Sequence, residues 1–111
     1  MAILGAPDVA RRTLARLHRV ASPGARLLGA NRDWSRNSDP HARERAKRNM
    51  DTGRFSGQHR SRIRYRTFAT PFFTSSRMSV DELRELVKDT GWIVTDILDR
   101  DEGIYIAVLE R

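Results

Sequence analysis

The sequence has no cysteine, few aromatic residues and no long apolar run. Without cysteine there can be no disulfide framework, no thiolate nucleophile and no cysteine-based zinc site. No apolar stretch approaches the ~18–20 residues that a membrane-spanning helix needs. The first ten residues also lack the basic and apolar regions of a secretory signal. We therefore expect a cytoplasmic protein that is not embedded in a membrane.

The seven glycines include no Gly-x-Gly pair. The sequence also contains no phosphate-cradling loop. The three histidines do not have the spacing of metal ligands, so no metal site is expected either.

The positive charge is concentrated in one segment. The whole chain carries a net +7, and residues 32–66 contain eleven Arg and Lys residues against four acids. Such a segment attracts anionic small molecules or nucleic acid. No recognised nucleic-acid-binding motif is present, and the neighbouring aromatic residues Trp34, Phe55, Tyr65 and Phe68 form no stacking array. A basic nucleic-acid-binding module centred on residues 32–66 is therefore kept as the alternative function.

The first third of the chain predicts a helix followed by a strand. Residues 8–21 place apolar side chains on one face and arginines opposite, which is typical of an amphipathic helix, with Asp8 as its N-cap. The sequence Ser22-Pro23-Gly24 ends this helix. A short, mostly apolar strand is expected at residues 25–31.

The segment 32–58 is almost entirely polar. Asp39-Pro40 is typical of a helix start, and Gly53 of a helix end. The helix between them offers only Ala42, Ala46 and Met50 as an apolar stripe, which is too little to hold it firmly. We expect a mobile surface insertion here.

Residues 60–68 alternate as a strand does. One face of this strand would carry Arg60, Arg62, Arg64 and Arg66. Thr70-Pro71 would break it, and a second extended segment is expected to run from Phe72 to Met78.

The last third has the clearest local signals. Ser79 and Glu82 form a capping box, and Met78 and Leu83 a hydrophobic staple, for a helix that Gly91 would end. Two strands at 92–98 and 104–109, joined by the charged turn 99–103, predict a hairpin. In the last strand Ile104, Ile106 and Val108 share one face, and Tyr105, Ala107 and Leu109 the other. Both faces are apolar, which predicts a sheet covered by helices on both sides.

Two stretches resemble, in order and spacing, the second half of class I S-adenosylmethionine-dependent methyltransferases. Residues 14–28 are similar to the family's helix, Pro-Gly turn and apolar fifth strand. Residues 78–87, followed by Thr90-Gly91-Trp92 and the ending Tyr105–Leu109, are similar to its capped helix and closing hairpin. The segment Ala2-Ile3-Leu4-Gly5 resembles the end of the fourth strand and its loop.

The resemblance implies an α/β fold, a partial Rossmann-like methyltransferase sheet with a C-terminal antiparallel strand hairpin and flanking helices. This half-domain would span residues 1–111, with a polar basic insertion at 32–58. The intact family domain uses S-adenosylmethionine, which it holds with an acidic-x-Gly-x-Gly loop that this sequence lacks. The expectation is therefore the C-terminal, acceptor-side portion of a small-molecule methyltransferase, inactive alone and without a cofactor of its own. The resemblance does not assign catalytic residues.

In open α/β sheets, ligands bind beyond the carboxyl ends of the strands. The insertion and the arginine strand would therefore cover a pocket for the methyl acceptor. Arginine side chains there could bind a carboxylate or phosphate of the acceptor in bidentate fashion. An alternative is an arginine face that is simply solvated. Tyr65, His59 and His41 could act as bases, with a structural role for each as the alternative. The candidate acceptor-binding residues are Asn31, Asp33, Arg54, Gln58, Arg60, Arg62, Arg64 and Tyr65.

In such a half-domain the strand 25–31 would lack a neighbour. Exposed strand edges tend to pair with other chains. The expected partner is the missing N-terminal half or a second copy of this chain, with marginal stability or self-association when the chain is alone. A third possibility is an interaction subunit that uses this edge to bind another protein.

Overall fold

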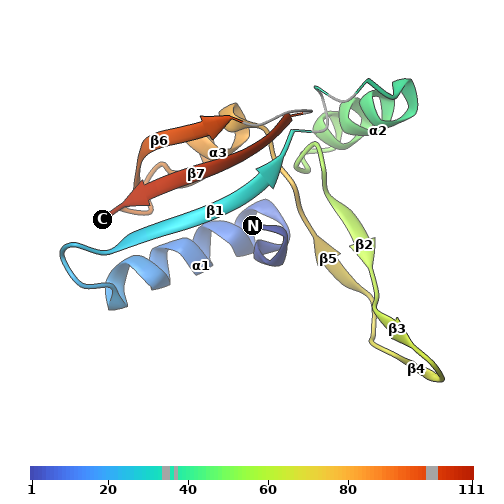
Figure 1. Cartoon of the computed structure of the whole chain (residues 1–111), viewed down its shortest axis with the longest axis horizontal. Coiled ribbons are helices and arrows are strands. Elements are labelled where there is room, and N and C mark those ends of the chain that lie inside the picture. Colours follow the sequence, from blue (N-terminus) through green and yellow to red (C-terminus); the bar gives the residue numbers. More distant parts are fainter. Residues whose placement is uncertain (34–35, 37, 100–102) are drawn as a thin grey trace.

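The chain is a mixed α/β protein in the computed structural model, which describes residues 1–33, 36, 38–99 and 103–111 (Figure 1). A single short 3-10 turn precedes the first helix in this part of the chain. The elements, in order, are η1 (Ala2–Leu4), α1 (Pro7–Val20), β1 (Arg26–Arg32), α2 (Pro40–Asp51), β2 (His59–Ser61), β3 (Arg64–Tyr65), β4 (Phe68–Ala69), β5 (Phe73–Ser75), α3 (Val80–Val87), β6 (Ile93–Asp99) and β7 (Ile104–Glu110).

The largest sheet has the strand order β1-β7-β6, and both pairings are antiparallel. The predicted C-terminal hairpin is confirmed, and the predicted strand at 25–31 lies beside it, with Leu28 opposite Val108 and Gly29 opposite Ala107. Residues 100–102 of the predicted turn lie outside the described residues. The first strand and the closing hairpin, which are more than 60 residues apart in the sequence, thus share one sheet.

Helices α1 and α3 cover one face of this sheet. Tyr105, Ala107 and Leu109 of β7 are fully buried in a core that also contains Leu14 of α1 and Leu83 of α3. The predicted alternation of β7 is therefore confirmed. The two helices and this face of the sheet make up what we call the body of the protein.

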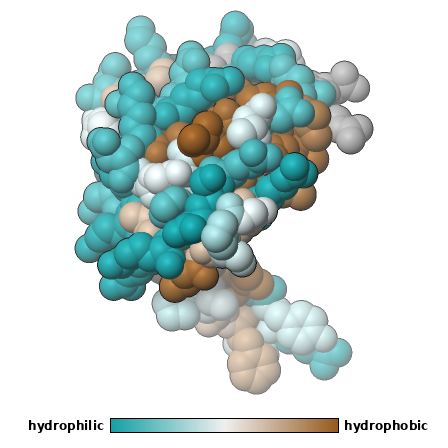
Figure 2. All heavy atoms as spheres, turned by 90° about the vertical axis from the view of Figure 1, so that its left-hand side faces the viewer, coloured by the Kyte–Doolittle hydropathy of each residue, from teal (hydrophilic) through white to brown (hydrophobic). Residues whose placement is uncertain are grey.

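The opposite face of the sheet is open, which contradicts the predicted cover of helices on both sides. Leu28 of β1 is 68% exposed and Ile93 of β6 is 62% exposed, and Leu98 and Ile104 are also exposed. Figure 2, which views the molecule from the left-hand side of Figure 1, shows apolar side chains gathered on part of the surface. Nothing among the described residues supplies the second layer that so apolar a sheet normally has.

Helix α1 is placed as expected, but its details differ from the prediction. Its N-cap is Ala6 and Pro7 is its first residue, so Asp8 lies in the first turn and does not cap the helix. Only Ala10 and Leu14 are buried, while Val20, expected on the apolar face, is 84% exposed. No helix in the described part of the chain is long and apolar enough to cross a membrane.

The capping box of α3 is confirmed. The Ser79 hydroxyl accepts a hydrogen bond from the Glu82 amide, and the Glu82 carboxylate accepts one from the Ser79 amide. The helix ends at Val87, earlier than predicted. Gly91 instead allows a turn with φ +92°, where a side chain would also collide with the ring of His18.

The polar segment contains a formed helix, α2. Asp39 caps it by accepting a hydrogen bond from the amide of His41, and Pro40 is its first residue, as predicted. Ala42 and Ala46 are buried, whereas Met50, the third residue of the expected apolar stripe, is about half exposed. These two small side chains lie outside the main core, so the helix contributes little to it, as its short apolar stripe predicts.

The predicted single strand over residues 60–68 is wrong. The chain turns back between Tyr65 and Phe68, where Arg66 has φ +53°, so β3 pairs with β4 and β2 with β5. We call residues 59–75 the arm, because this two-stranded ribbon projects away from the body (Figure 1). The segment Ala2–Gly5, expected as the end of a strand, forms the 3-10 turn η1 instead.

Candidate functional site

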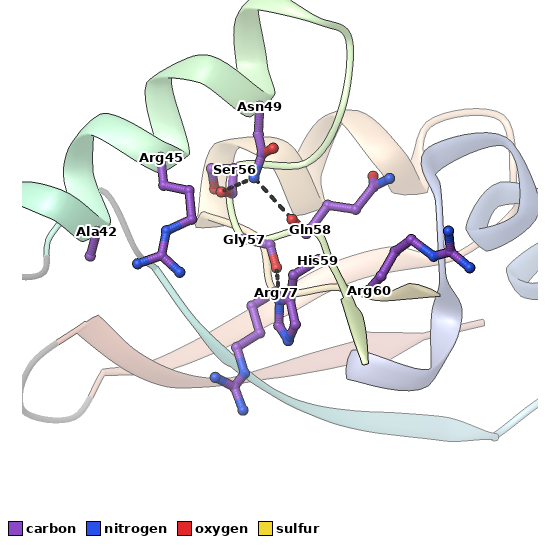
Figure 3. A pocket seen from close by; sticks show the side chains of 9 residues that line it. All are labelled: Ala42, Arg45, Asn49, Ser56, Gly57, Gln58, His59, Arg60 and Arg77. Atoms are coloured by element: carbon purple, nitrogen blue, oxygen red, sulfur yellow. Dashed lines mark hydrogen bonds between the residues drawn. The ribbon is translucent and has the colours of Figure 1, made fainter. Parts of the chain in front are cut away.

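A cavity of about 430 Å³ lies between α2 and the base of the arm (Figure 3). Its lining is basic and polar, and none of the described residues that line it is acidic. A cavity of this size fits a small molecule. The lining residues are Ala42, Arg45, Asn49, Ser56, Gly57, Gln58, His59, Arg60 and Arg77.

Hydrogen bonds from two sides hold the loop that forms one wall. From α2, the Asn49 amide nitrogen donates to the carbonyls of Ser56 and Gln58, at 3.0 Å each. From α3, the Glu82 carboxylate accepts from the Ser56 amide at 2.7 Å and from the Ser56 hydroxyl. The capping carboxylate of α3 thus also ties the cavity loop to the body.

His59 is part of the same framework. Its Nδ1 lies 3.0 Å from the Gly57 carbonyl, and its Nε2 lies 3.2 Å from the Ser75 hydroxyl. Gly57 is further held by paired backbone hydrogen bonds with Arg77. Both ring nitrogens are thus engaged, and His59 connects the loop at Gly57 to Ser75 at the base of the arm.

One of the three arginines of the lining points away from the other two. Arg45 of α2 and Arg77 extend toward the same side of the cavity in Figure 3, whereas Arg60 points away from both. The guanidinium carbon of Arg60 lies 5.5 Å from the ring centre of Phe72, so this cation is engaged with the arm. Among the described residues Arg45 has no ion pair.

A second hollow of about 320 Å³ lies at the carboxyl end of β1. Arg77 lines both hollows, so they adjoin. Asn31, which is 5% exposed, contributes the oxygen Oδ1 that accepts no hydrogen bond from the described residues. Its amide nitrogen lies 3.1 Å from the Met1 sulfur, which is a weak acceptor. The residues around this hollow are Met1, Ala30, Asn31, Arg32, Arg77 and Ile104.

Tyr105 lies buried beneath this region. Its hydroxyl donates to the Met78 carbonyl at 2.7 Å. Burial raises the pKa of Tyr105 well above its ordinary value, the nearby carboxylates of Asp33 and Glu82 raise this pKa further, and the Asn31 amide opposes them. Tyr105 therefore stays protonated at neutral pH and serves as a hydrogen-bond donor rather than as a base.

The structure brings together only part of the predicted site. Gln58 and Arg60 line the first hollow and Asn31 the second. Asp33 is buried nearby, with its backbone amide bonded to the Gly103 carbonyl, and lines neither hollow. The remaining predicted residues line neither hollow: Arg54 is exposed, and Arg62, Arg64 and Tyr65 lie on the exposed arm.

The sequence prediction missed Arg45, Asn49 and Arg77. The first two lie on the face of α2 that carries the buried Ala42 and Ala46, at helical spacings of three and four residues. That spacing was visible in the sequence. Arg77 offered no local signal, because only the pairing of β2 with β5 brings it beside Gly57.

The described residues do not fit S-adenosylmethionine. All pairings between the strands that the structure describes are antiparallel, and side chains of Asp39 and Ser79 already cap α2 and α3. Helix α1 follows a 3-10 turn rather than a glycine-rich loop after a strand. No step of methyl transfer can therefore be assigned to a cofactor site on this chain. Among the described residues, no group of His, Asp and Glu could hold a metal ion.

Comparison with protein-family models, curated proteins and solved structures found no match to this chain.

Proposed function

We propose that this chain is the C-terminal, acceptor-side portion of an S-adenosylmethionine-dependent small-molecule methyltransferase, without activity of its own. The observation that carries the proposal is the strand order β1-β7-β6, with α1 and α3 on one face. In the resemblance drawn from the sequence, β1 corresponds to the fifth strand of the family sheet. The hairpin β6–β7 corresponds to its closing pair.

The open surfaces of the sheet support a larger domain. The outer edge of β1 pairs with no described strand, and the apolar face around Leu28 and Ile93 has no cover. A neighbouring strand from another segment would pair with the edge of β1, and helices from it would cover the apolar face. Sheets with two apolar faces are stable when they are covered on both sides. The missing cofactor-binding half would supply these elements.

The chain's own contribution would be to bind and orient the acceptor. The second hollow lies at the carboxyl end of β1, where ligands of α/β sheets bind, and the first hollow, between α2 and the base of the arm, shares Arg77 with it. Methyl transfer depends mainly on alignment of the acceptor with the methyl group. A rigid cavity wall, fixed by Asn49, Glu82 and His59, suits that role.

Titration calorimetry tests this proposal. The chain alone is expected to bind no S-adenosylmethionine. Co-expression with the segment encoded immediately upstream should yield a complex that does bind it, provided that this segment contains the acidic-x-Gly-x-Gly loop. The matched control is Leu28→Lys, which should prevent assembly by placing a charge on the open face. Micromolar binding by the chain alone, or an upstream sequence without such a loop, would contradict the proposal.

A second candidate function is nucleic-acid binding by the arm. The arm contains four arginines and no acidic residue, and it exposes Tyr65, Phe68, Phe72 and Phe73. Guanidinium groups that bind phosphates and aromatic rings that stack on bases are the usual means of binding single strands. The basic module expected at residues 32–66 would then be centred on the arm.

Fluorescence anisotropy with a single-stranded oligonucleotide tests this second function. Affinity should fall steeply as salt is raised, and Arg62→Gln with Arg64→Gln should weaken it. The control is Arg12→Gln with Arg19→Gln, which removes the same charge from α1. Affinity that does not depend on salt, or equal loss in the control, would rule out an arm-specific site.

A further inference from the structure

We infer that the arm docks on the surface of an anionic lipid bilayer, with one of its two faces inserted among the lipid headgroups. This inference goes beyond the methyltransferase proposal and does not depend on it. It rests on how the arm separates its apolar side chains from its basic ones.

One face of the arm is apolar. Strand alternation places Ser61, Ile63 and Tyr65 on the same side of the ribbon. Phe68 pairs with Tyr65 and Phe73 pairs with Ser61, so these two rings join that side. The four apolar side chains are all exposed, Ile63 to 63% and Phe68 to 75%. We call them the apolar face of the arm.

The opposite face of the arm is basic. Arg60, Arg62 and Arg64 alternate with the residues of the apolar face along the same strand, so they point to the other side. The guanidinium carbons of Arg60 and Arg62 lie 5.5 and 4.7 Å from the ring centre of Phe72, which lies on this side as well. The arm contains no acidic residue, and among the described residues these three arginines have no ion pair. The two faces therefore differ completely in character.

A bilayer surface is the partner that uses both faces. Segments with apolar side chains on one side and arginines on the other lie in the headgroup region, where long basic side chains reach back to the phosphates. Anionic headgroups also complement a ribbon whose charges are all positive. The arm projects away from the body, so its end can reach such a surface (Figure 1). A nucleic acid would use the basic face and leave the apolar face in water.

The size of the apolar face favours a bilayer over a second protein. A stable protein interface takes roughly 20–30 residues from each partner. The apolar face of the arm offers four exposed side chains. Binding to a bilayer has no such threshold, because its strength adds up from the apolar area that is buried and the attraction to anionic lipids.

The test is flotation of the full chain with lipid vesicles. We expect the chain to float with vesicles of phosphatidylcholine mixed with phosphatidylserine, and far less with phosphatidylcholine alone. Failure to float with the mixed vesicles would overturn the inference. Binding to a single-stranded oligonucleotide without binding to vesicles would assign the arm to nucleic acid and would also overturn it.

A matched pair of apolar variants tests the inserted face. Ile63→Ser should weaken binding to the mixed vesicles roughly fivefold or more, because this side chain would leave water on docking. Val20→Ser removes a β-branched side chain that is 84% exposed on α1, and should leave vesicle binding unchanged. Both side chains are exposed, so neither change should disturb folding. Equal binding by the two variants would show that the apolar face of the arm does not insert.

A matched pair of charge variants tests the basic face. Arg62→Gln with Arg64→Gln should weaken binding to the mixed vesicles by roughly tenfold. Arg12→Gln with Arg19→Gln removes the same charge from α1 and should have a much smaller effect. Equal weakening by the two pairs would assign the binding to general surface charge and overturn the inference.

The methyltransferase proposal and this inference can fail separately. Vesicle binding by the chain, with no assembly upon co-expression with the upstream segment, would remove the proposed function and keep the docking site. If assembly occurs, the complex should still bind vesicles. Loss of vesicle binding on assembly would place the apolar face of the arm inside the larger domain and overturn the inference.

Discussion

The body and the arm use similar strand-forming residues in opposite ways. In β7 of the body, Tyr105 and Leu109 are fully buried, whereas in the arm Tyr65 is 66% and Phe68 75% exposed. The arm in Figure 2 extends below the body, away from the main mass of the molecule. Apolar side chains in the body hold the fold together, while those of the arm contribute little to it and are available for contact with something else.

The largest loss of stability is expected from Trp92→Ala. Trp92 is buried, donates a hydrogen bond from Nε1 to the Leu14 carbonyl at 2.8 Å, and packs edge-on against His18. Loss of this anchor between β6 and α1 should lower the free energy of unfolding by about 3–5 kcal/mol. Urea denaturation followed by circular dichroism measures this loss. A change below 1 kcal/mol would show that the body does not depend on this contact.

Glu82→Ala should have the next largest effect, because Glu82 connects the two regions. The variant removes the capping box and leaves the Ser56 amide without its partner. We expect a loss of about 2 kcal/mol in the free energy of unfolding, together with faster hydrogen exchange at Ser56 and Gly57. Exchange that accelerates only within α3 would mean that the cavity loop is held by other contacts.

Tyr105→Phe tests the buried polar layer through its pH dependence. At neutral pH it should cost about 1 kcal/mol, from the lost hydrogen bond to the Met78 carbonyl. The pKa of Tyr105 is raised by folding from its ordinary value of 10.0, so this hydroxyl stabilises the fold below that pH and its contribution is lost as the pH rises further. Unfolding midpoints above pH 10 should therefore fall more steeply for the wild type than for the variant. Parallel pH profiles would contradict the buried position of Tyr105.

Phe68→Ala should change stability least, by less than about 0.5 kcal/mol, because this ring is exposed at the end of the arm. The measurement is the same denaturation as for Trp92→Ala, so the two variants compare the regions directly. A loss similar to that of Trp92→Ala would show that the arm packs on the body.

The sequence allowed the body to be predicted well and the arm poorly, for a physical reason. The capping box at Ser79 and the apolar alternation of β7 belong to packed elements. Packing of this kind requires particular residues at fixed spacings, and those spacings are visible in the sequence. In the arm, neither face of the strands is buried, so burial does not distinguish one long strand from two short ones. The alternation of arginines is compatible with both. The reversal at Arg66 also has no glycine or asparagine to mark it, although its φ is positive.

The candidate site was predicted only in part because it depends on tertiary contacts. Gln58 and Arg60 could be named from their place beside the basic strand, and Asn31 from its place at the end of β1. The position of α2, which brings Arg45 to the same cavity as Arg77, is tied to the cavity loop by the hydrogen bonds of Asn49 to the carbonyls of Ser56 and Gln58. No local pattern in the sequence predicts such side-chain-to-backbone contacts.

In the proposed larger domain, the open sheet face and the edge of β1 that pairs with no described strand would both be covered. Sedimentation velocity on the chain alone, over a range of micromolar concentrations, tests whether these surfaces bind a partner. We expect self-association that grows with concentration and is reduced by Leu28→Lys, because exposed apolar faces and unpaired strand edges tend to bind other chains. A monodisperse monomer at every concentration, with a single cooperative unfolding transition, would contradict the claim.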